Sequence, residues 1–431
     1  MSFGPRVALL GLLCLRIWLA TMPVAGVASA APLLLQPPSG HELEIRQFDG
    51  QGATAMLWLP SERGFLPAHD AQARSLAGLG YKVWLADLHK SYFIRPGRAS
   101  IHQFPVDDVV ALIDAAVVAS DGELILVADG RGAQLALIAV REWQLRNPGN
   151  AAIRGIILNH PHLYAARPSP GARADYLPIV TATNLPVYLI AAQYSTKFSR
   201  LQELAQLLGS NGNPVYTRVL GGVQGGFVTR DDADISALDL AAKRDYAATL
   251  SSAAKLLLKM QPPRQAVQNA GDTRQFGGLA DADPVLRALS PPLAAPRLRL
   301  QDLDGTSFAL EAHRDQVVLV NFWASWCRPC VTEIPSLHRL EAMLKDTDFR
   351  IVTVNVGEDR DRVRQFLQQV PVELPLLMDY DAAISKDWMI YVYPSSYLVD
   401  RQGKIRYAYL GALEWDSTEN LRIIRNLLSE R

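Results

Sequence analysis

The sequence predicts an α/β protein with two domains, each built on a β-sheet covered by helices. Short apolar runs alternate with helical patterns on both sides of a segment rich in Pro, Gly and Ala, and such alternation is typical of α/β sheets. The chain has 431 residues, which exceeds what one hydrophobic core ordinarily accommodates. We therefore expect a larger domain over residues 31–262, a linker over 263–295 and a smaller domain over 296–431.

Residues 1–30 are predicted to be a signal peptide and not part of either domain. Arg6 supplies a positive charge, an apolar stretch interrupted by Arg16 follows, and residues 28–30 (Ala-Ser-Ala) fit the small-x-small pattern of a cleavage site. An uncleaved membrane anchor is the alternative, which the charge of Arg16 disfavours. No later segment contains the roughly 18 apolar residues that a spanning helix needs. Because the signal peptide is predicted to be cleaved, we expect a protein exported to the periplasm.

The larger domain is expected to contain a mostly parallel sheet with helices on both faces. Lys82–Ala86, Leu124–Ala128 and Val187–Ala191 are short apolar runs, as expected of strands that are buried on both faces. Helical patterns lie between such runs, for example over 107–118 and 132–143. Alternation of this kind argues for a mostly parallel sheet.

The smaller domain repeats this alternation on a smaller scale. Val317–Phe322 is predicted to be a buried strand, and a helix over 327–345 follows it. A second strand is expected over Arg350–Val356 and a second helix over 359–369. An amphipathic pattern near the C-terminus predicts a closing helix with one apolar face.

The charged residues are balanced, with 43 Lys and Arg against 43 Asp and Glu. No net field therefore attracts nucleic acid or an anionic membrane, and no nucleic-acid partner is expected. This balance does not exclude a local patch of one charge.

The cysteine content indicates a catalytic role for the cysteines and not a fold that is held together by disulfides. Cys14 lies in the predicted signal peptide, which leaves Cys327 and Cys330 as the cysteines of the expected mature chain. A large exported protein with a single close pair does not rely on disulfides for its fold. The two sulfurs are therefore candidates for a catalytic role.

Cys327 and Cys330 follow a predicted strand and open the predicted helix. A helix N-terminus lowers the pKa of a thiol through its free N–H groups and positive dipole end, and the thiolate is the form that attacks a disulfide. Cys327 is therefore the expected nucleophile, and Cys330, one turn later, is the residue that resolves the mixed disulfide. Arg328 adds a positive charge that acts in the same direction, and Pro329 suits the first turn of a helix.

Three other roles are open to such a pair. A zinc site needs two further ligands, and no other cysteine remains in the expected mature chain. Haem attachment needs a His directly after the second cysteine, where Val331 stands. An inert buried pair is the third, and the position at a helix N-terminus favours redox chemistry over it. We expect no metal and no cofactor other than the redox-active Cys327–Cys330 pair.

Around these residues the sequence resembles a known family. The segment VVLVNFWASWCRPCVTEIPSL (Val317–Leu337) is similar to the active-site segment of TlpA/ResA-type exported thioredoxin-like proteins. LQDLDGTSFAL (Leu300–Leu310) resembles their strand-turn-strand entry, and YPSSYLVDRQGKI (Tyr393–Ile405) resembles their segment around a cis-proline. The match covers about 296–431 and implies a thioredoxin-like fold with thiol–disulfide oxidoreductase activity.

The resemblance also implies roles for residues around the dithiol. Pro394 is expected to be the cis-proline facing the dithiol, which leaves the backbone of Tyr393 free to pair with a substrate strand. Trp326 matches an aromatic position near the site. Glu333 matches an acidic residue that can relay protons, and the alternative is a solvated residue of the first helical turns. Asn321 stands where cytoplasmic thioredoxins carry a buried Asp, so we expect different proton handling.

The reaction implied by the resemblance is the reduction of disulfides in exported proteins. Electrons would come from a membrane thiol carrier, and cytochrome c maturation is a candidate pathway. A dithiol oxidase or isomerase is an alternative, because Arg328 stabilises the thiolate of Cys327 and thereby favours a more oxidising couple. A binding protein without catalysis is a further alternative.

The larger domain resembles an α/β-hydrolase without its catalytic residues. LILVADGRGAQLALIAV is similar to the strand–turn–helix that carries the nucleophile, but Gly130 stands at the nucleophile's position. The strand over 186–192 is followed by residues 193–195 (Gln-Tyr-Ser) with no carboxylate, and the late loop over 221–227 contains no His. We therefore expect a non-catalytic module that binds a client or a partner.

A hydrolase with a different nucleophile is an open alternative. Asp129 precedes Gly130 and could serve if a base and a positioned water accompanied it. His160 and His162 are the close histidine pair of this domain. They are either loop residues without such a role or two ligands of a metal site that needs an acidic third ligand.

Overall fold

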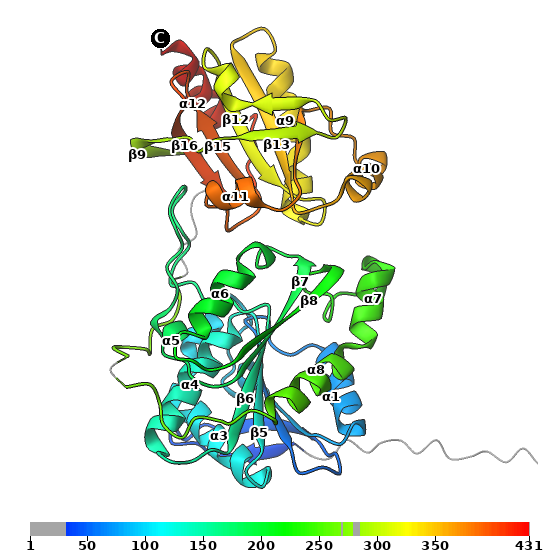
Figure 1. The fold of residues 1–431 in the computed structure, drawn as a ribbon, viewed down its shortest axis with the longest axis vertical. Helices are drawn as coiled ribbons and strands as arrows, with labels where there is room; N and C mark the ends of the chain where they lie inside the picture. Colours follow the sequence, from blue (N-terminus) through cyan, green and yellow to red (C-terminus); the bar gives the residue numbers. More distant parts are fainter. Residues whose placement is uncertain (1–31, 269, 279–284, 431) are drawn as a thin grey trace, which may run out of the picture. The chain divides into compact units, whose positions relative to one another are not determined.

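The computed structural model describes residues 32–268, 270–278 and 285–430 of the chain (Figure 1). These residues form two sheets of eight strands, each accompanied by helices. The predicted α/β class with two sheets is therefore confirmed. The predicted signal peptide lies outside the described residues. Within the described ranges, no helix combines the length and the apolar character needed to cross a membrane.

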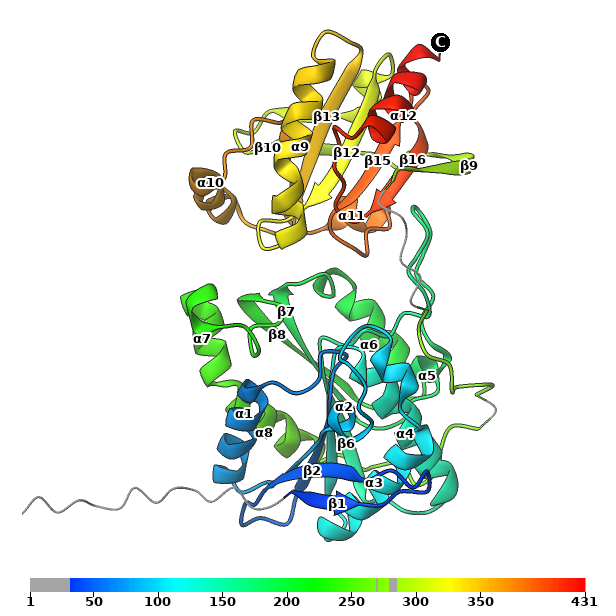
Figure 2. The same ribbon diagram turned by 180° about the vertical axis from the view of Figure 1, so that it is seen from behind.

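The first sheet is mostly parallel, as predicted. Its strand order is β1-β2-β4-β3-β5-β6-β7-β8 (Figures 1 and 2). Strand β2 pairs antiparallel with β1 and with β4, and every pair from β4 through β8 is parallel. The strands are β1 (Leu33–Leu35), β2 (Leu43–Phe48), β3 (Ala55–Leu59), β4 (Lys82–Ala86), β5 (Leu124–Asp129), β6 (Ile153–Asn159), β7 (Val187–Tyr194) and β8 (Val215–Gln224).

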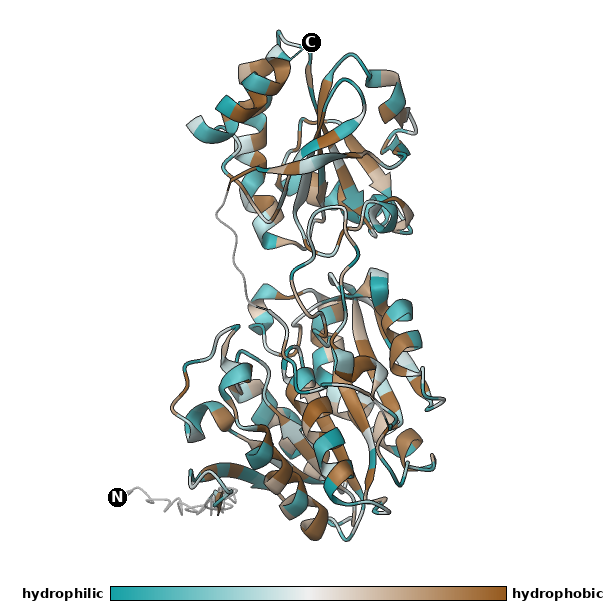
Figure 3. Cartoon of the chain, turned by 90° about the vertical axis from the view of Figure 1, so that its left-hand side faces the viewer, coloured by the Kyte–Doolittle hydropathy of each residue, from teal (hydrophilic) through white to brown (hydrophobic). Residues whose placement is uncertain are grey.

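Helices cover both faces of the first sheet. Apolar side chains of α3, α4, α5 and α6 pack against one face, and those of α1 and α8 pack against the other. The helices are α1 (Pro67–Gly78), α2 (Leu88–Ser91), α3 (Val106–Ala119), α4 (Gly132–Arg146), α5 (Pro178–Thr181), α6 (Leu201–Leu208), α7 (Ala237–Arg244) and α8 (Tyr246–Leu257). Apolar residues are concentrated in the strands and on the inward faces of these helices (Figure 3).

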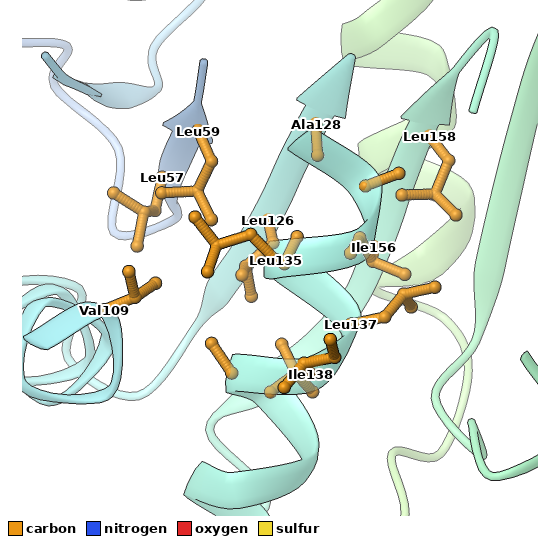
Figure 4. Close-up of a cluster of buried hydrophobic side chains, with 14 of the residues drawn as sticks. Leu57, Leu59, Val109, Leu126, Ala128, Leu135, Leu137, Ile138, Ile156 and Leu158 are labelled. Atoms are coloured by element: carbon orange, nitrogen blue, oxygen red, sulfur yellow. The ribbon is translucent and has the colours of Figure 1, made fainter. Parts of the chain in front are cut away.

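Strand β3 illustrates why the central strands are apolar throughout. Leu57 and Leu59 point to the side of α3 and α4, where they meet Val109 and Leu135 (Figure 4). Met56 points to the opposite face, in the cluster that includes side chains of α1 and α8. Because successive strand residues face opposite sides, a strand buried on both faces shows no polar alternation.

Two glycines shape the turn between β5 and α4. Gly130 has a φ angle of +52°, a conformation that glycine adopts without a steric cost. Helix α4 begins at Gly132, and a Cβ atom there would overlap the carbonyl oxygen of Pro60. Two glycines are thus required by the backbone geometry of this turn.

The second sheet has the order β11-β10-β14-β13-β12-β15-β16-β9. Strands β12, β13 and β14 are parallel to one another, and the remaining pairs are antiparallel. The strands are β9 (Arg287–Ala294), β10 (Arg299–Asp302), β11 (Ser307–Ala309), β12 (Val317–Trp323), β13 (Phe349–Val356), β14 (Leu376–Asp379), β15 (Ser395–Val399) and β16 (Lys404–Leu410).

The helices of the second sheet also lie on both of its faces. Apolar residues of α9 and α12 pack with Val317 and Leu319, whereas residues of α10 and α11 pack with Val318 and Val320 on the opposite face. Asp359 caps α10 by accepting the N–H of Arg362 at 2.8 Å. The helices are α9 (Arg328–Leu344), α10 (Arg360–Gln369), α11 (Ala383–Asp387) and α12 (Thr418–Ser429).

The predicted linker over 263–295 is too broad. Arg141 of α4 donates from Nε to Thr273 Oγ1 at 3.2 Å and from Nη1 to the carbonyl of Val267 at 2.8 Å. Residues Arg287–Ala294 form the edge strand β9, which pairs with β16. Prolines are tolerated at a sheet edge, and a Pro-rich composition therefore did not distinguish this strand from a linker.

We predict that Gly132→Ala lowers the free energy of unfolding by roughly 3 kcal/mol, because the new methyl group forces α4 away from Pro60. Gly78→Ala is the matched control, since its Cβ would meet no atom within 4 Å. It should change the free energy of unfolding by less than about 1 kcal/mol. Urea unfolding of both variants measures this difference, and equal stabilities would contradict the close approach.

Candidate redox site

Cys327 and Cys330 lie where β12 gives way to α9. Cys327 is the N-cap residue of α9, and its Sγ accepts the N–H of Cys330 at 3.3 Å. The two sulfurs form a disulfide with an S–S distance of 2.05 Å. In the reduced protein this N–H and the positive end of the helix dipole favour the thiolate of Cys327. The site can therefore exchange a dithiol with a disulfide.

The sequence-predicted neighbours of the dithiol are brought together. The rings of Trp326 and Tyr393 meet edge to face with their centroids 5.6 Å apart. The peptide bond between Tyr393 and Pro394 is cis, as expected from the resemblance. Arg328 and Pro329 are exposed on the first turn of α9, so the positive charge of Arg328 faces solvent beside the disulfide.

The backbone next to the cis-proline has free groups. Strand β15 begins at Ser395, which pairs with Phe322 of β12. The carbonyl of Pro394 accepts the N–H of Gly411 at 2.8 Å. Within the described residues, the N–H and C=O of Tyr393 make no backbone hydrogen bond. An extended peptide could bind these groups as an added strand.

Glu333 is buried, so its alternative interpretation as a solvated helix residue is wrong. The side chain accepts hydrogen bonds from Asn321 Nδ2 at 2.7 Å, the N–H of Leu413 at 3.1 Å and Trp415 Nε1 at 3.3 Å. Burial raises the pKa of Glu333 to about 7, against the opposing effect of these hydrogen bonds. Asn321 also donates to Ser396 Oγ at 2.9 Å, which fixes its amide toward Glu333.

Glu358 is a functional candidate that the sequence interpretation missed. Its buried carboxylate accepts both the backbone N–H of Ser325 at 2.6 Å and the hydroxyl of the same residue. Asn355 Nδ2 and Arg362 Nε donate to it at 2.8 and 2.7 Å. Ser325 belongs to the short connection between β12 and Cys327, so Glu358 positions the segment that carries the nucleophile. The signal was available, because parallel neighbouring strands end at the same edge of a sheet.

The polar residues near Gly130 in the first sheet are already engaged by one another. Asp129 accepts hydrogen bonds from Trp58 Nε1 and Asn159 Nδ2, both at 2.7 Å, and lies 4.0 Å from His69 Nε2. Burial raises the pKa of Asp129. A carboxyl group held this way by two donors is a structural acceptor, which does not favour its interpretation as a nucleophile.

Both rings of the close histidine pair contact protein groups. His160 Nε2 accepts the N–H of Ala192 at 2.7 Å, and its Nδ1 lies 2.7 Å from Asn159 Oδ1. His162 Nε2 lies 3.3 Å from Arg131 Nη2. Among the described residues there is no group of three or more His, Cys, Asp and Glu side chains that could hold a metal ion.

Gly130 leaves a space that a carboxylate occupies. A Cβ atom at Gly130 would lie 2.8 Å from Glu62 Oε2. The same oxygen accepts the N–H of Arg131 at 3.0 Å. Glu62, on the loop after β3, therefore occupies the space beside Gly130 and binds the backbone N–H that follows it.

Comparisons with known proteins agree with the geometry of the second sheet. Residues 293–408 match the AhpC/TSA family. The chain is 29% identical over 119 residues to the thiol-disulfide oxidoreductase ResA of Geobacillus thermodenitrificans, an alignment that covers 28% of this chain and 68% of that protein. It is 31% identical over 122 residues to the thioredoxin-like protein YneN of Bacillus subtilis, which covers 28% and 71%.

Among solved structures, this chain is similar to a putative thiol:disulfide interchange protein DsbE from Chlorobium tepidum. It is 29% identical, with a TM-score of 0.31 over 32% of this chain and 97% of that one. The resemblance of the C-terminal region to TlpA/ResA-type thioredoxin-like oxidoreductases is confirmed by the family match and the curated relatives.

We predict that stability depends on the protonation of Glu333. Its folded pKa of about 7 lies above the unfolded value of 4.5, so the folded state retains a proton that the unfolded state loses. This contribution is present below about pH 4.5 and is lost as the pH rises through 7, by up to roughly 3 kcal/mol. Urea unfolding of the oxidised protein at several pH values measures it. Glu333→Gln should remove this slope, whereas exposed Glu373→Gln should keep it.

We predict that Glu358→Gln lowers the free energy of unfolding by roughly 3 kcal/mol, because it removes the charge of a buried carboxylate that pairs with the half-buried Arg362. Misplacement of the Cys327 segment should also slow disulfide reduction by roughly 10- to 100-fold. A pH profile of Cys327 alkylation separates positioning from mere stability, since a displaced helix N-terminus raises the thiol pKa. Exposed Glu414→Gln is the control, and an unchanged profile in Glu358→Gln would contradict the positioning role.

Proposed function

Because this chain belongs to the AhpC/TSA family of thioredoxin-fold proteins and is a thiol-disulfide oxidoreductase, we propose that it reduces disulfides of exported proteins in the periplasm. The observation that carries this proposal is the Cys327–Cys330 pair at the start of α9, beside the unpaired backbone of Tyr393. The predicted signal peptide over 1–30 supports the location.

The proposed reaction is two successive thiol–disulfide exchanges. The thiolate of Cys327 attacks one sulfur of the substrate disulfide, and the other substrate sulfur leaves as a thiolate and takes up a proton. The thiolate of Cys330 then attacks Cys327 Sγ and releases the second substrate sulfur as a thiolate, which is also protonated. Two electrons pass to the substrate, and the protein is left with the Cys327–Cys330 disulfide. A membrane thiol carrier would return the electrons.

Glu333 is the proposed proton relay for this exchange. It stands one helical turn after Cys330 on α9, and residues three apart on a helix are neighbours. A carboxyl group with a pKa of about 7 can both accept and give a proton near neutral pH. The hydrogen bonds from Asn321 and Trp415 keep the carboxyl group in one place during this transfer.

Substrate binding is proposed at the aromatic pair and the free backbone. Trp326 and Tyr393 offer apolar contact beside the disulfide, and the N–H and C=O of Tyr393 can pair with an extended substrate segment. Backbone pairing is insensitive to sequence, so this site accommodates several exported proteins. Cytochrome c maturation is one candidate pathway.

The first sheet is proposed to form a module that binds a client or partner. Its α/β-hydrolase-like turn carries Gly130 where a nucleophile would stand, and Glu62 accepts the N–H that an oxyanion would need. A scaffold that keeps the binding end of its sheet without these groups is suited to recognition. A hydrolase that uses Asp129 is the less favoured alternative.

The direction of electron flow is tested by the reduction potential of the Cys327–Cys330 pair, measured by equilibration in dithiothreitol or glutathione buffers with alkylation trapping. We expect a potential of about −270 mV or lower, as for a reductase that needs a dedicated donor. A value near about −120 mV would favour the oxidase, in line with the exposed charge of Arg328 beside Cys327.

Cysteine variants of the full chain test whether it forms mixed disulfides with other proteins. Cys330→Ser should accumulate mixed disulfides through Cys327, and Cys327→Ser should accumulate none. A strain that lacks this protein provides a second test. If neither variant trapped a protein, and if Cys327→Ser corrected the phenotype of that strain, the chain would be a binding protein without catalysis.

A further inference from the structure

A buried carboxyl group ends the third parallel strand of the second sheet. Asp379 is the last residue of β14 and pairs with Val356, the last residue of β13. It is 1% exposed. Because parallel strands end at the same edge of a sheet, Asp379 lies at the edge where the Cys327 segment leaves β12. No step of the proposed disulfide exchange uses this carboxyl group.

Asp379 holds the start of α11. Its Oδ1 accepts the N–H of Ile384 at 3.1 Å, and its Oδ2 accepts the N–H of Ser385 at 2.7 Å. Both N–H groups lie in the first turn of α11, where they have no partner inside the helix. The residue before the helix, Ala382, has a φ angle of +59°, which is unfavourable for residues other than glycine. Its side chain cannot cap the helix, so the carboxyl group of Asp379 takes that role from a neighbouring strand.

The end of α11 leads to Tyr393. The N–H of Ile390 donates to the carbonyl of Ser385 at 2.9 Å, and the N–H of Met389 donates to the carbonyl of Lys386 at 3.0 Å. With Met389 at a φ angle of +53°, these two bonds form a Schellman motif, which ends the helix in a defined direction. The chain then continues directly to Tyr393, so a displacement of α11 also displaces the backbone of this residue.

The side chain of Tyr393 contacts the same helix. The hydroxyl groups of Tyr393 and Ser385 share a hydrogen bond. Burial raises the pKa of Tyr393, and the nearby carboxyl group of Asp379 acts in the same direction. The ring of Tyr393 also meets the ring of Trp326, next to Cys327. Tyr393 is therefore held between α11 and the aromatic neighbour of the dithiol.

We propose that Asp379 is a positioning residue for substrate binding, which acts through α11 to hold the N–H and C=O of Tyr393 where an extended substrate segment pairs with them. This inference rests on the proposed function, because it takes Tyr393 as the substrate-binding residue. Backbone pairing requires a peptide. Loss of the Asp379 carboxylate should therefore impair exchange with peptide disulfides and spare exchange with small disulfides that have no backbone.

The test measures disulfide exchange of the full chain with two probes, a short synthetic peptide closed by one disulfide and the disulfide of β-mercaptoethanol. In Asp379→Asn an amide donor replaces one acceptor oxygen, so one N–H of α11 loses its partner. We expect KM for the peptide to rise roughly tenfold, with kcat changed by less than about twofold. The rate with the small disulfide and the pH profile of Cys327 alkylation should not change.

A matched control and a second variant complete the test. Asp387 is exposed on the same helix, and Asp387→Asn should leave exchange with both probes unchanged. If Asp379→Asn does not fold, Tyr393→Phe removes the hydroxyl group that contacts Ser385 and should raise KM for the peptide in the same selective way. An unchanged KM for the peptide in the folded variant, or an equal loss of rate with both probes, would overturn the proposal.

Exchange is measured in both directions, from the reduced protein with the oxidised peptide and from the oxidised protein with the reduced peptide. Pairing with the backbone of Tyr393 is needed in either direction. A wild-type protein that only oxidises the peptide would therefore contradict the reductase proposal, whereas the comparison of Asp379→Asn with wild type would still decide the role of Asp379.

Discussion

Glu358 binds both polar hydrogens of Ser325, and this interaction joins the ends of two neighbouring strands where the dithiol emerges. The carboxylate is itself held by Asn355 and Arg362, so the connection before Cys327 is fixed from the sheet and not only from the helix. The helix N-terminus can act on the thiolate of Cys327 only if the sulfur stays at the cap position. The chemistry at the surface therefore depends on a charge buried behind it.

A second buried carboxyl group, Glu333, has a different balance of forces. Glu358 has a cationic partner in Arg362, whereas Glu333 has neutral donors from Asn321, Leu413 and Trp415. Burial therefore dominates over these neutral donors and raises the pKa of Glu333. One domain thus contains a carboxylate suited to hold structure and a carboxyl group suited to exchange a proton.

Much of this arrangement could be predicted from the sequence, because it is local. Continuous apolar runs located the central strands, and the position of Cys327 between a strand and a helix followed from the order of residues. Strand β8 was missed, because its two glycines and its exposed residues lack an apolar pattern. Strand β9 was missed because its two prolines predict a linker, although an edge strand also tolerates proline. Glu358 was missed because its partner Ser325 is distant in the chain, and only the shared edge of the parallel strands β12 and β13 relates the two residues.

The space beside Gly130 bears on how the first sheet could change over evolutionary time. A serine placed there would have its Cβ 2.8 Å from Glu62 Oε2, and it would have to adopt a φ angle of +52°. Glu62 is in turn bound to the N–H of Arg131. A nucleophile at position 130 therefore requires at least two coordinated substitutions, the first of which is unfavourable alone. Packing around Gly130 thus disfavours a nucleophilic side chain at this turn.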